Sequence, residues 1–164
     1  MGRIPQNYVP QHLSNKSKRK AASELKKSQR EYKKGKYHTR KKIKGFKNRN
    51  TSWVSKVIEI YDLDKNKPIN INVLGKKTKC KKSALEKIIK KGQGAYYSSG
   101  SRPNQTAHSW GKARLYSAIS GGPAAKVDGH ILVNGCKPSS KALKLSKTAR
   151  IPNKKTIKIG GRNR

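Results

Sequence analysis

Residues 92–122 read GQGAYYSSGSRPNQTAHSWGKARLYSAISGG, and this stretch decides the fold. Its first half is rich in Gly and Ser, which predicts a loop. Thr106 then stands where a helix N-cap is expected, and Gly121-Gly122 closes the helix. The apolar residues between them recur at helical spacing: Trp110, Ala113, Leu115, Tyr116 and Ile119. The pattern predicts a helix that packs one face on a small core.

On the N-terminal side, residues 1–14 are predicted to be an extended arm, because two prolines disfavour a helix there. Ser14 is a plausible N-cap for a helix that runs to about Lys34, and Gly35 is its stop signal. Residues 35–51 are expected to form a second basic arm.

Four more segments complete the expected elements. Residues 52–61 and 83–91 carry apolar side chains at helical spacing and predict helices, with Gly92 ending the second. Residues 69–74 alternate between apolar and polar types, and residues 130–134 lie between two tight turns, so both predict short strands. Residues 137–164 are expected to be a basic tail with a final strand near 156–159.

The expected fold class is mainly α with little β: a small, mostly helical core with extended basic N- and C-terminal arms. The domains are an N-terminal arm with one helix (1–51), the core (52–136) and a C-terminal tail (137–164). The core is expected to contain Trp53, Val57, Ile58, Leu85, Ile88, Ile89, Trp110, Leu115, Ile131 and Val133.

The charge balance points to a polyanionic or acidic partner. The chain has 42 Lys and Arg against 7 Asp and Glu, which gives a formal net charge of +35 over 164 residues. Only 32% of residues are hydrophobic, so a large core is not expected. Lys outnumbers Arg, which favours diffuse attraction to phosphate over bidentate readout of bases.

Seven carboxylates leave little for catalysis, and we expect no enzyme, no cofactor and no small-molecule substrate. Asp62 to Asn66 starts like a calcium loop, but Lys67 and Val73 occupy positions that need Gly and Glu. Cys80 and Cys136 show no zinc-ligand spacing with His108 or His130, so no metal is expected. Without a secretion signal, the two cysteines are expected to be reduced thiols.

The best candidate binding site is the loop Ser98-Ser99-Gly100-Ser101-Arg102. Small residues allow backbone N–H groups to converge on an anion, and hydroxyls and a guanidinium add donors. The alternative is that this loop packs on Trp110 and Tyr116 and only shapes the core.

Aromatic and Arg side chains in the arms are candidate contacts to partners, either as anchors in protein pockets or as stacking platforms for bases. These residues are Tyr8, Arg30, Tyr32, Tyr37, Arg40, Phe46 and Arg49.

Residues 91–122, KGQGAYYSSGSRPNQTAHSWGKARLYSAISGG, resemble a short uncharacterised domain in proteins of large nucleocytoplasmic DNA viruses, such as the algal-virus and mimivirus groups, and in some phages. The pattern YVP..LS at Tyr8–Ser14 and the stretch SQREYKKGKYHTRKKIKGFKNRNTSWV at Ser28–Val54 are similar to a second motif in small basic proteins of the same viruses. The domain has no known function, so the resemblance carries over no catalytic residues.

The resemblance implies a virion protein. Such virions have a capsid lattice over an internal membrane, and small minor capsid proteins line the inner face of that lattice. We therefore expect a structural protein on the inner side of the capsid that bridges capsomers through its basic arms. Its partners would be the major capsid protein and other minor capsid proteins, and packaged DNA or membrane headgroups as further counter-charges.

Two other functions stay open. A sequence-independent DNA-binding or DNA-condensing core protein of the virion fits the charge equally well. A ribosomal-type RNA-binding protein fits the composition, since such proteins also combine a small core with basic tails. No apolar run in the sequence approaches the length of a membrane span.

Overall fold

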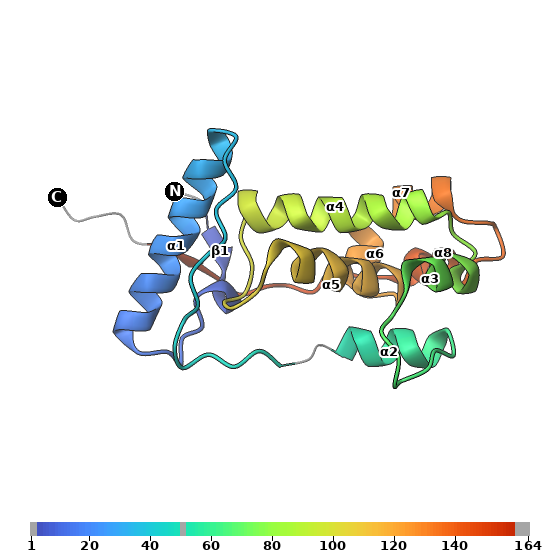
Figure 1. Ribbon diagram of the computed structural model, residues 1–164, viewed down its shortest axis with the longest axis horizontal. Coiled ribbons are helices and arrows are strands. Elements are labelled where there is room, and N and C mark those ends of the chain that lie inside the picture. The colour runs from blue at the N-terminus through green and yellow to red at the C-terminus, as the bar shows by residue number, and fades with distance from the viewer. Residues whose placement is uncertain (1–2, 50–51, 160–164) are drawn as a thin grey trace. The chain divides into compact units, whose positions relative to one another are not determined.

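The computed structural model describes residues 3–49 and 52–159. Within these ranges the chain forms eight α-helices and two short strands (Figure 1), which confirms a mainly α fold with little β. The helices are α1 (Asn15–Lys33), α2 (Ser52–Ile60), α3 (Ile71–Thr78), α4 (Lys82–Ser98), α5 (Ala107–Ile119), α6 (Pro123–Val127), α7 (Gly129–Gly135) and α8 (Lys141–Thr148).

The chain divides into two compact units that do not follow the linear order of the sequence. The first, here the N-terminal unit, contains Met1–Arg49, Gly94–Ala107 and Asn153–Arg164. The second, here the central unit, contains Asn50–Gln93 and His108–Pro152. From the sequence alone, domain boundaries were expected after residues 51 and 136 instead. Residue 51 itself lies outside the described residues.

Helix α1 begins and ends where the sequence predicts. The Ser14 side chain accepts a hydrogen bond from Ser17 N, and Gly35 has a φ of +74° just beyond the helix. Ala21 and Leu25 on its inner face are buried in a cluster of their own. That cluster consists of Ile4, Val9, Leu13, Ala21, Leu25 and Ile43, so the segments expected as arms contribute most of an apolar core.

The two ends of the described chain pair with each other. Strands β1 (Arg3–Pro5) and β2 (Thr156–Lys158) form an antiparallel two-stranded sheet in which Ile4 lies opposite Ile157. The pairing confirms the predicted final strand. It also gives Pro5 a place at a sheet edge, where the missing N–H group costs little.

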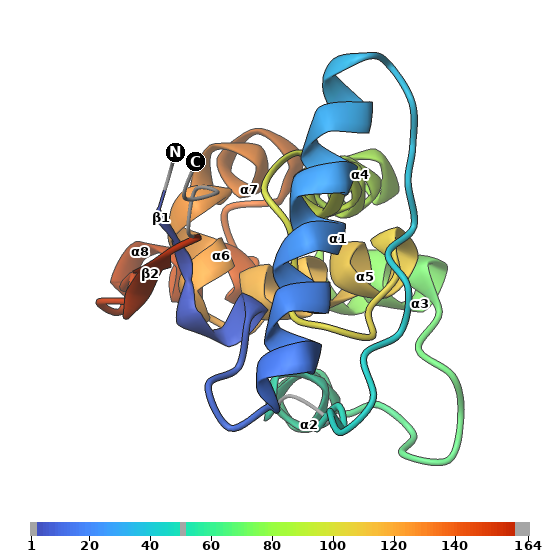
Figure 2. The same ribbon diagram turned by 90° about the vertical axis from the view of Figure 1, so that its left-hand side faces the viewer.

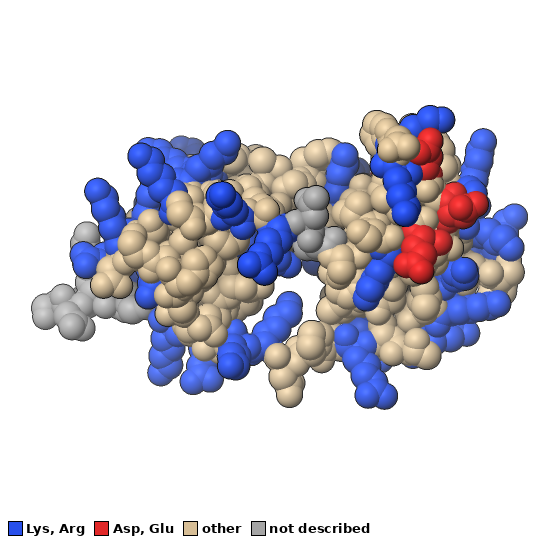
Figure 3. Space-filling view, turned by 90° about the horizontal axis from the view of Figure 1, so that it is seen from below, with Lys and Arg blue, Asp and Glu red and all other residues tan. Residues whose placement is uncertain are grey.

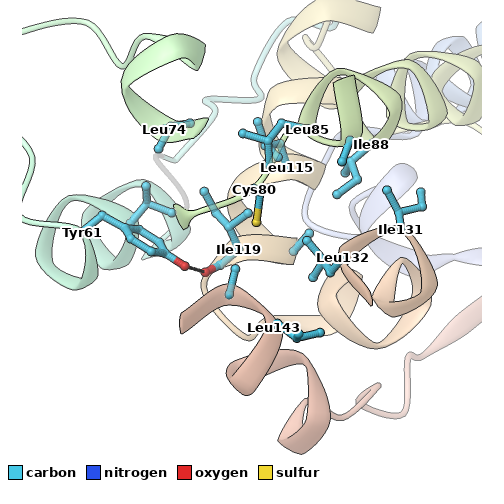
Figure 4. Packing of buried hydrophobic residues seen from close by; sticks show 14 residues of the cluster. Tyr61, Leu74, Cys80, Leu85, Ile88, Leu115, Ile119, Ile131, Leu132 and Leu143 are labelled. Atoms are coloured by element: carbon cyan, nitrogen blue, oxygen red, sulfur yellow. Dashed lines mark hydrogen bonds between the residues drawn. The ribbon is translucent and has the colours of Figure 1, made fainter. Parts of the chain in front are cut away.

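The larger apolar core lies in the central unit (Figure 4). Five predicted members are buried: Val57, Leu85, Ile88, Leu115 and Ile131. Four are only partly buried: Trp53, Ile58, Ile89 and Trp110. Val133 is 61% exposed, whereas the unpredicted Leu74, Leu132 and Leu143 are buried. Tyr61 adds a polar contact, because its hydroxyl donates to Ile119 O, and burial raises its pKa.

Helices α4 and α5 run side by side at a contact made by glycines (Figure 1). A Cβ on Gly92 would lie 2.7 Å from Gly111 Cα, and a Cβ on Gly111 would lie 2.6 Å from Ile89 O. Helix α4 does not end at Gly92 but continues to Ser98. The prediction of a helix end at Gly92 and a loop after it was wrong, because glycine here serves close packing between helices.

Both predicted internal strands are helices. Residues 69–74 alternate, but Asn70 caps α3 by accepting from Asn72 N, and Leu74 and Thr78 are buried one turn apart. Residues 130–134 lie in α7, where adjacent Ile131 and Leu132 are buried together. Alternation over five or six residues is too short to exclude a helix. Helices α6, α7 and α8 pack against one another (Figure 2).

Cys80 and Cys136 form a disulfide, so the expectation of two reduced thiols was wrong. The backbones of the two cysteines pair as an antiparallel bridge. Lys81 N donates to Gly135 O at 2.8 Å, and Lys137 N donates to Lys79 O at 2.9 Å. This pairing places the two side chains opposite each other. No helix in the described part of the chain has both the length and the apolar character to cross a membrane.

Candidate functional site

The N-terminal unit contains an open cavity of about 1200 Å³. Four parts of the chain that are distant in sequence form its wall: residues 6, 7 and 10–12, residues 45–49, Arg102, and Lys154 with Lys155. None of the described residues that line it carries a carboxylate. Its cations are Lys47, Arg49, Arg102, Lys154 and Lys155, so the cavity concentrates positive charge.

Pairing of the chain ends brings Lys154 and Lys155 to the cavity. Beyond the β1–β2 sheet, Gln6 N donates to Lys155 O at 2.8 Å. The lysines at 154 and 155 therefore lie beside the short 3-10 helix Gln6–Tyr8 rather than in a free tail.

Asn104 fixes the segment that contributes residues 45–49 to the cavity. Its Nδ2 donates to Ile43 O at 3.2 Å and to Phe46 O at 3.0 Å, and its Oδ1 accepts from Ile43 N at 2.7 Å. Asn48 Nδ2 in turn donates to Asn104 O at 2.8 Å. Asn104 adopts a φ of +61°, a conformation that Asn tolerates better than most residues. The side-chain amide of Asn104 thus fixes the backbone path of residues 43–48.

Two of the lining residues form an aromatic pair. The rings of His12 and Phe46 are nearly parallel, with an interplanar angle of 22° and centroids 6.2 Å apart. Phe46 also packs against the apolar cluster of the N-terminal unit, which anchors it while part of it remains exposed. The cavity therefore combines flat apolar surface with cations.

The structure separates the five residues of the predicted anion loop. Ser98 ends α4, and the N–H groups of Ser99 and Gly100 both donate to Ala95 O at 2.9 Å, so helix capping occupies them. Ser101 is buried, and its hydroxyl donates to Arg102 O. Only Arg102 lies at the cavity, and its Nε is buried without a hydrogen-bond partner among the described residues.

Arg40, expected as a contact to a partner, has internal contacts instead. Its guanidinium lies 3.9 Å from the centroid of the buried Tyr96 ring and donates to Tyr96 O at 2.8 Å. It also donates to the hydroxyls of Ser28 and Ser101. Burial lowers the pKa of Arg40, although an Arg side chain stays charged at neutral pH. This side chain joins residues 36–49 to the end of α4.

The other predicted contacts fall into four groups. Tyr8 is partly buried beside Gly100. Phe46 and Arg49 line the cavity. Arg30 is exposed on α1. The rings of Tyr32 and Tyr37, 36% and 72% exposed, gather with that of Tyr97, and the ring centroids are 5.1–6.2 Å apart.

Two of the seven carboxylates, Glu24 and Asp128, are turned inward and form specific contacts within the protein. Glu24 lies 2.9 Å from His38 Nε2 and accepts from Lys41 N. Burial opposes ionisation of Glu24, but these contacts outweigh it and lower the pKa. Asp128 is fully buried. Figure 3 shows the result on one face: Lys and Arg project at many points, whereas the few acids gather in one area.

Sequence reasoning missed most of the cavity. Gln6, His12, Lys47, Lys154 and Lys155 belong to it, yet nothing in their local sequence distinguishes them from other polar residues in basic segments. The one usable signal was the run GFKNRN at residues 45–50, where an aromatic residue is followed by cations and amides.

A family model described as "Family of unknown function (DUF5824)" matches residues 5–130 of the chain. No curated protein and no solved structure matches it.

Proposed function

The chain belongs to the DUF5824 family, whose function is unknown, and we propose that it is a non-enzymatic protein that binds the phosphate backbone of nucleic acid without reading its sequence. The observation that carries the proposal is the cavity of the N-terminal unit. Five cations line it, Arg102 among them, and no carboxylate among the described lining residues opposes them. Phosphate oxygens are the acceptors that such donors bind most strongly.

The rest of the surface supports the same function. With 42 cations and 7 carboxylates, most Lys and Arg cannot find an internal counter-charge. A polyanion that binds such a surface releases its condensed counterions, which favours association at low salt whatever the base sequence. Lysine, a flexible point charge, suits this mode of binding better than it suits base recognition.

The test is the affinity for two duplexes of unrelated sequence, measured by fluorescence anisotropy between 50 and 200 mM salt. We expect equal affinities that fall steeply with salt, by about 0.9 in log K per unit of log salt for each phosphate contact. Absence of binding at 50 mM salt, or a strong preference for one sequence, would contradict the proposal.

The setting that we propose is the particle of a large DNA virus, on the basis of the sequence resemblance. A second candidate function within it is that of a minor capsid protein on the inner face of the shell. The cluster of Tyr32, Tyr37 and Tyr97 favours it, because exposed tyrosines are frequent anchors of protein interfaces.

Quantitative mass spectrometry of fractionated particles distinguishes the two candidate functions. A fixed ratio to the major capsid protein in the shell supports the capsid function, and enrichment with the genome supports nucleic-acid binding.

A further inference from the structure

The cavity of the N-terminal unit has features that diffuse attraction to phosphate does not require. We propose that it binds unpaired nucleotides, so that the protein prefers single-stranded nucleic acid to duplex. The inference rests on the proposed function and specifies its ligand. It draws on three properties of the cavity: an aromatic surface, a size that suits more than a phosphate, and an arginine in its lining.

The aromatic surface is the first step. His12 and Phe46 both line the cavity, and their rings are nearly parallel. A base stacks on such a ring whatever its identity, because every base has a flat π face. In a duplex the faces of the bases are covered by their neighbours, so this surface is useful only to an unpaired base.

The size and the polar lining are the second step. Pockets for small organic ligands usually measure about 300–1000 Å³, and this cavity, at about 1200 Å³, exceeds what a phosphate group alone would fill. Four residues with amide side chains also line the cavity: Gln6, Asn7, Gln11 and Asn48. Amides offer both a donor and an acceptor, which suits the edges of all four bases.

Arg102 is the third step. Whereas internal acceptors hold the guanidinium of Arg40, the Nε of Arg102 is buried without a partner among the described residues. That atom is closed to solvent, but the Arg102 side chain as a whole is only partly buried and lines the cavity. Its guanidinium charge can therefore balance a phosphate bound there. The lysines at 47, 154 and 155 line the same cavity and supply counter-charges for further phosphates.

The test uses the full chain and four probes: a 12-nucleotide oligothymidylate, a DNA duplex of the same length, a single-stranded RNA of the same length and free thymidine monophosphate. Phe46→Leu keeps an apolar side chain for packing but removes the ring. Arg102→Gln removes the charge but keeps a polar side chain. Lys126→Gln on α6, in the central unit, is the matched control for the loss of one exposed cation.

Wild type should bind either single strand more tightly than the duplex, and the monophosphate far more weakly than both strands. Phe46→Leu should weaken single-strand binding about tenfold and leave the duplex unchanged. Arg102→Gln should also weaken it and reduce the salt slope by about one. Lys126→Gln should lower all affinities slightly and keep their ratio.

Cross-linking keeps the proposal testable if a variant fails to fold. A wild-type complex with an oligothymidylate that carries 5-iodouracil should cross-link at Phe46 or His12 after irradiation. Duplex binding as tight as single-strand binding, with cross-links spread over lysine-rich surfaces, would overturn this inference and leave the proposed function intact. Loss of binding to every probe would overturn both, and tight binding of the monophosphate alone would replace the strand with a free nucleotide.

Discussion

Asp128 is a carboxylate without solvent exposure whose two partners are cations of the central unit. Arg114 donates to it from Nε at 2.7 Å and from Nη2 at 2.9 Å, and Lys91 Nζ lies 2.7 Å away. Burial by itself would raise the pKa of Asp128, but these hydrogen bonds and charges outweigh it and lower the pKa. The triad links α4 and α5 to the turn between α6 and α7.

Replacement of Asp128 by Asn should lower the free energy of unfolding by about 3–5 kcal/mol at pH 7, because it leaves two cations without their buried counter-charge. Since the folded-state pKa is lowered, the stabilisation by ionised Asp128 is present above the unfolded-state pKa of about 3.9. It is lost as the pH falls through the folded-state pKa. Urea unfolding of both proteins from pH 7 to pH 2.5 checks this. A difference in unfolding free energy between them that stays constant down to pH 2.5 would contradict it.

Gly111 shows how one missing methyl group sets the distance between two helices. Gly111→Ala would place a Cβ 2.6 Å from Ile89 O, which is a backbone atom and cannot move aside cheaply. We expect a loss of about 1–3 kcal/mol in a thermal or urea melt. Gly129→Ala is the control, because nothing lies within 4 Å of its Cβ, and it should be neutral or stabilising. Equal effects of the two substitutions would show that helix propensity, and not packing between helices, determines the change in stability.

At the scale of elements, residues 43–48 have no regular secondary structure of their own, and their path depends on Asn104. Asn104→Gly tolerates the φ of +61° but removes the side-chain bonds. The amide of Ile43 should then exchange with solvent about five to ten times faster, as expected for loss of about 1 kcal/mol of hydrogen bonding. Hydrogen exchange followed by NMR measures it, with an amide in α8 as an internal reference. Unchanged exchange at Ile43 would mean that packing alone holds the segment.

The sequence predicted some elements well and others poorly, for different physical reasons. Helix α1 was predicted closely because its signals are local: a capping serine at Ser14 and a glycine at Gly35. Helices α3 and α7 were mistaken for strands because a short apolar run fits both periods until its packing partners are known. The extension of α4 through Gly92 was missed because its partner, Gly111, lies in another helix.

At the scale of the molecule, the disulfide joins residues 56 positions apart in the central unit. Such a link restricts the unfolded chain, and its reduction should lower the free energy of unfolding by about 2–4 kcal/mol. Urea melts with and without reductant check this. The double variant Cys80→Ser, Cys136→Ser should unfold at the same urea concentration as the reduced protein, and reductant should not change its melt. Identical melts of the wild type in both conditions would show that the bridge does not stabilise the unit.

The sequence by itself determined the helical class of this protein and its excess of positive charge, because helix caps, apolar periodicity and composition are local properties. It also marked Phe46, Arg49 and Arg102 as residues for contact. Only the tertiary structure decided that they share one cavity with Lys154 and Lys155, because that depends on strand pairing between the chain ends. It alone turned Arg40 inward, since the acceptors on Tyr96 and Ser101 come from a segment about 60 residues away. Contacts between distant segments leave no period in a sequence, and the candidate site consists of such contacts.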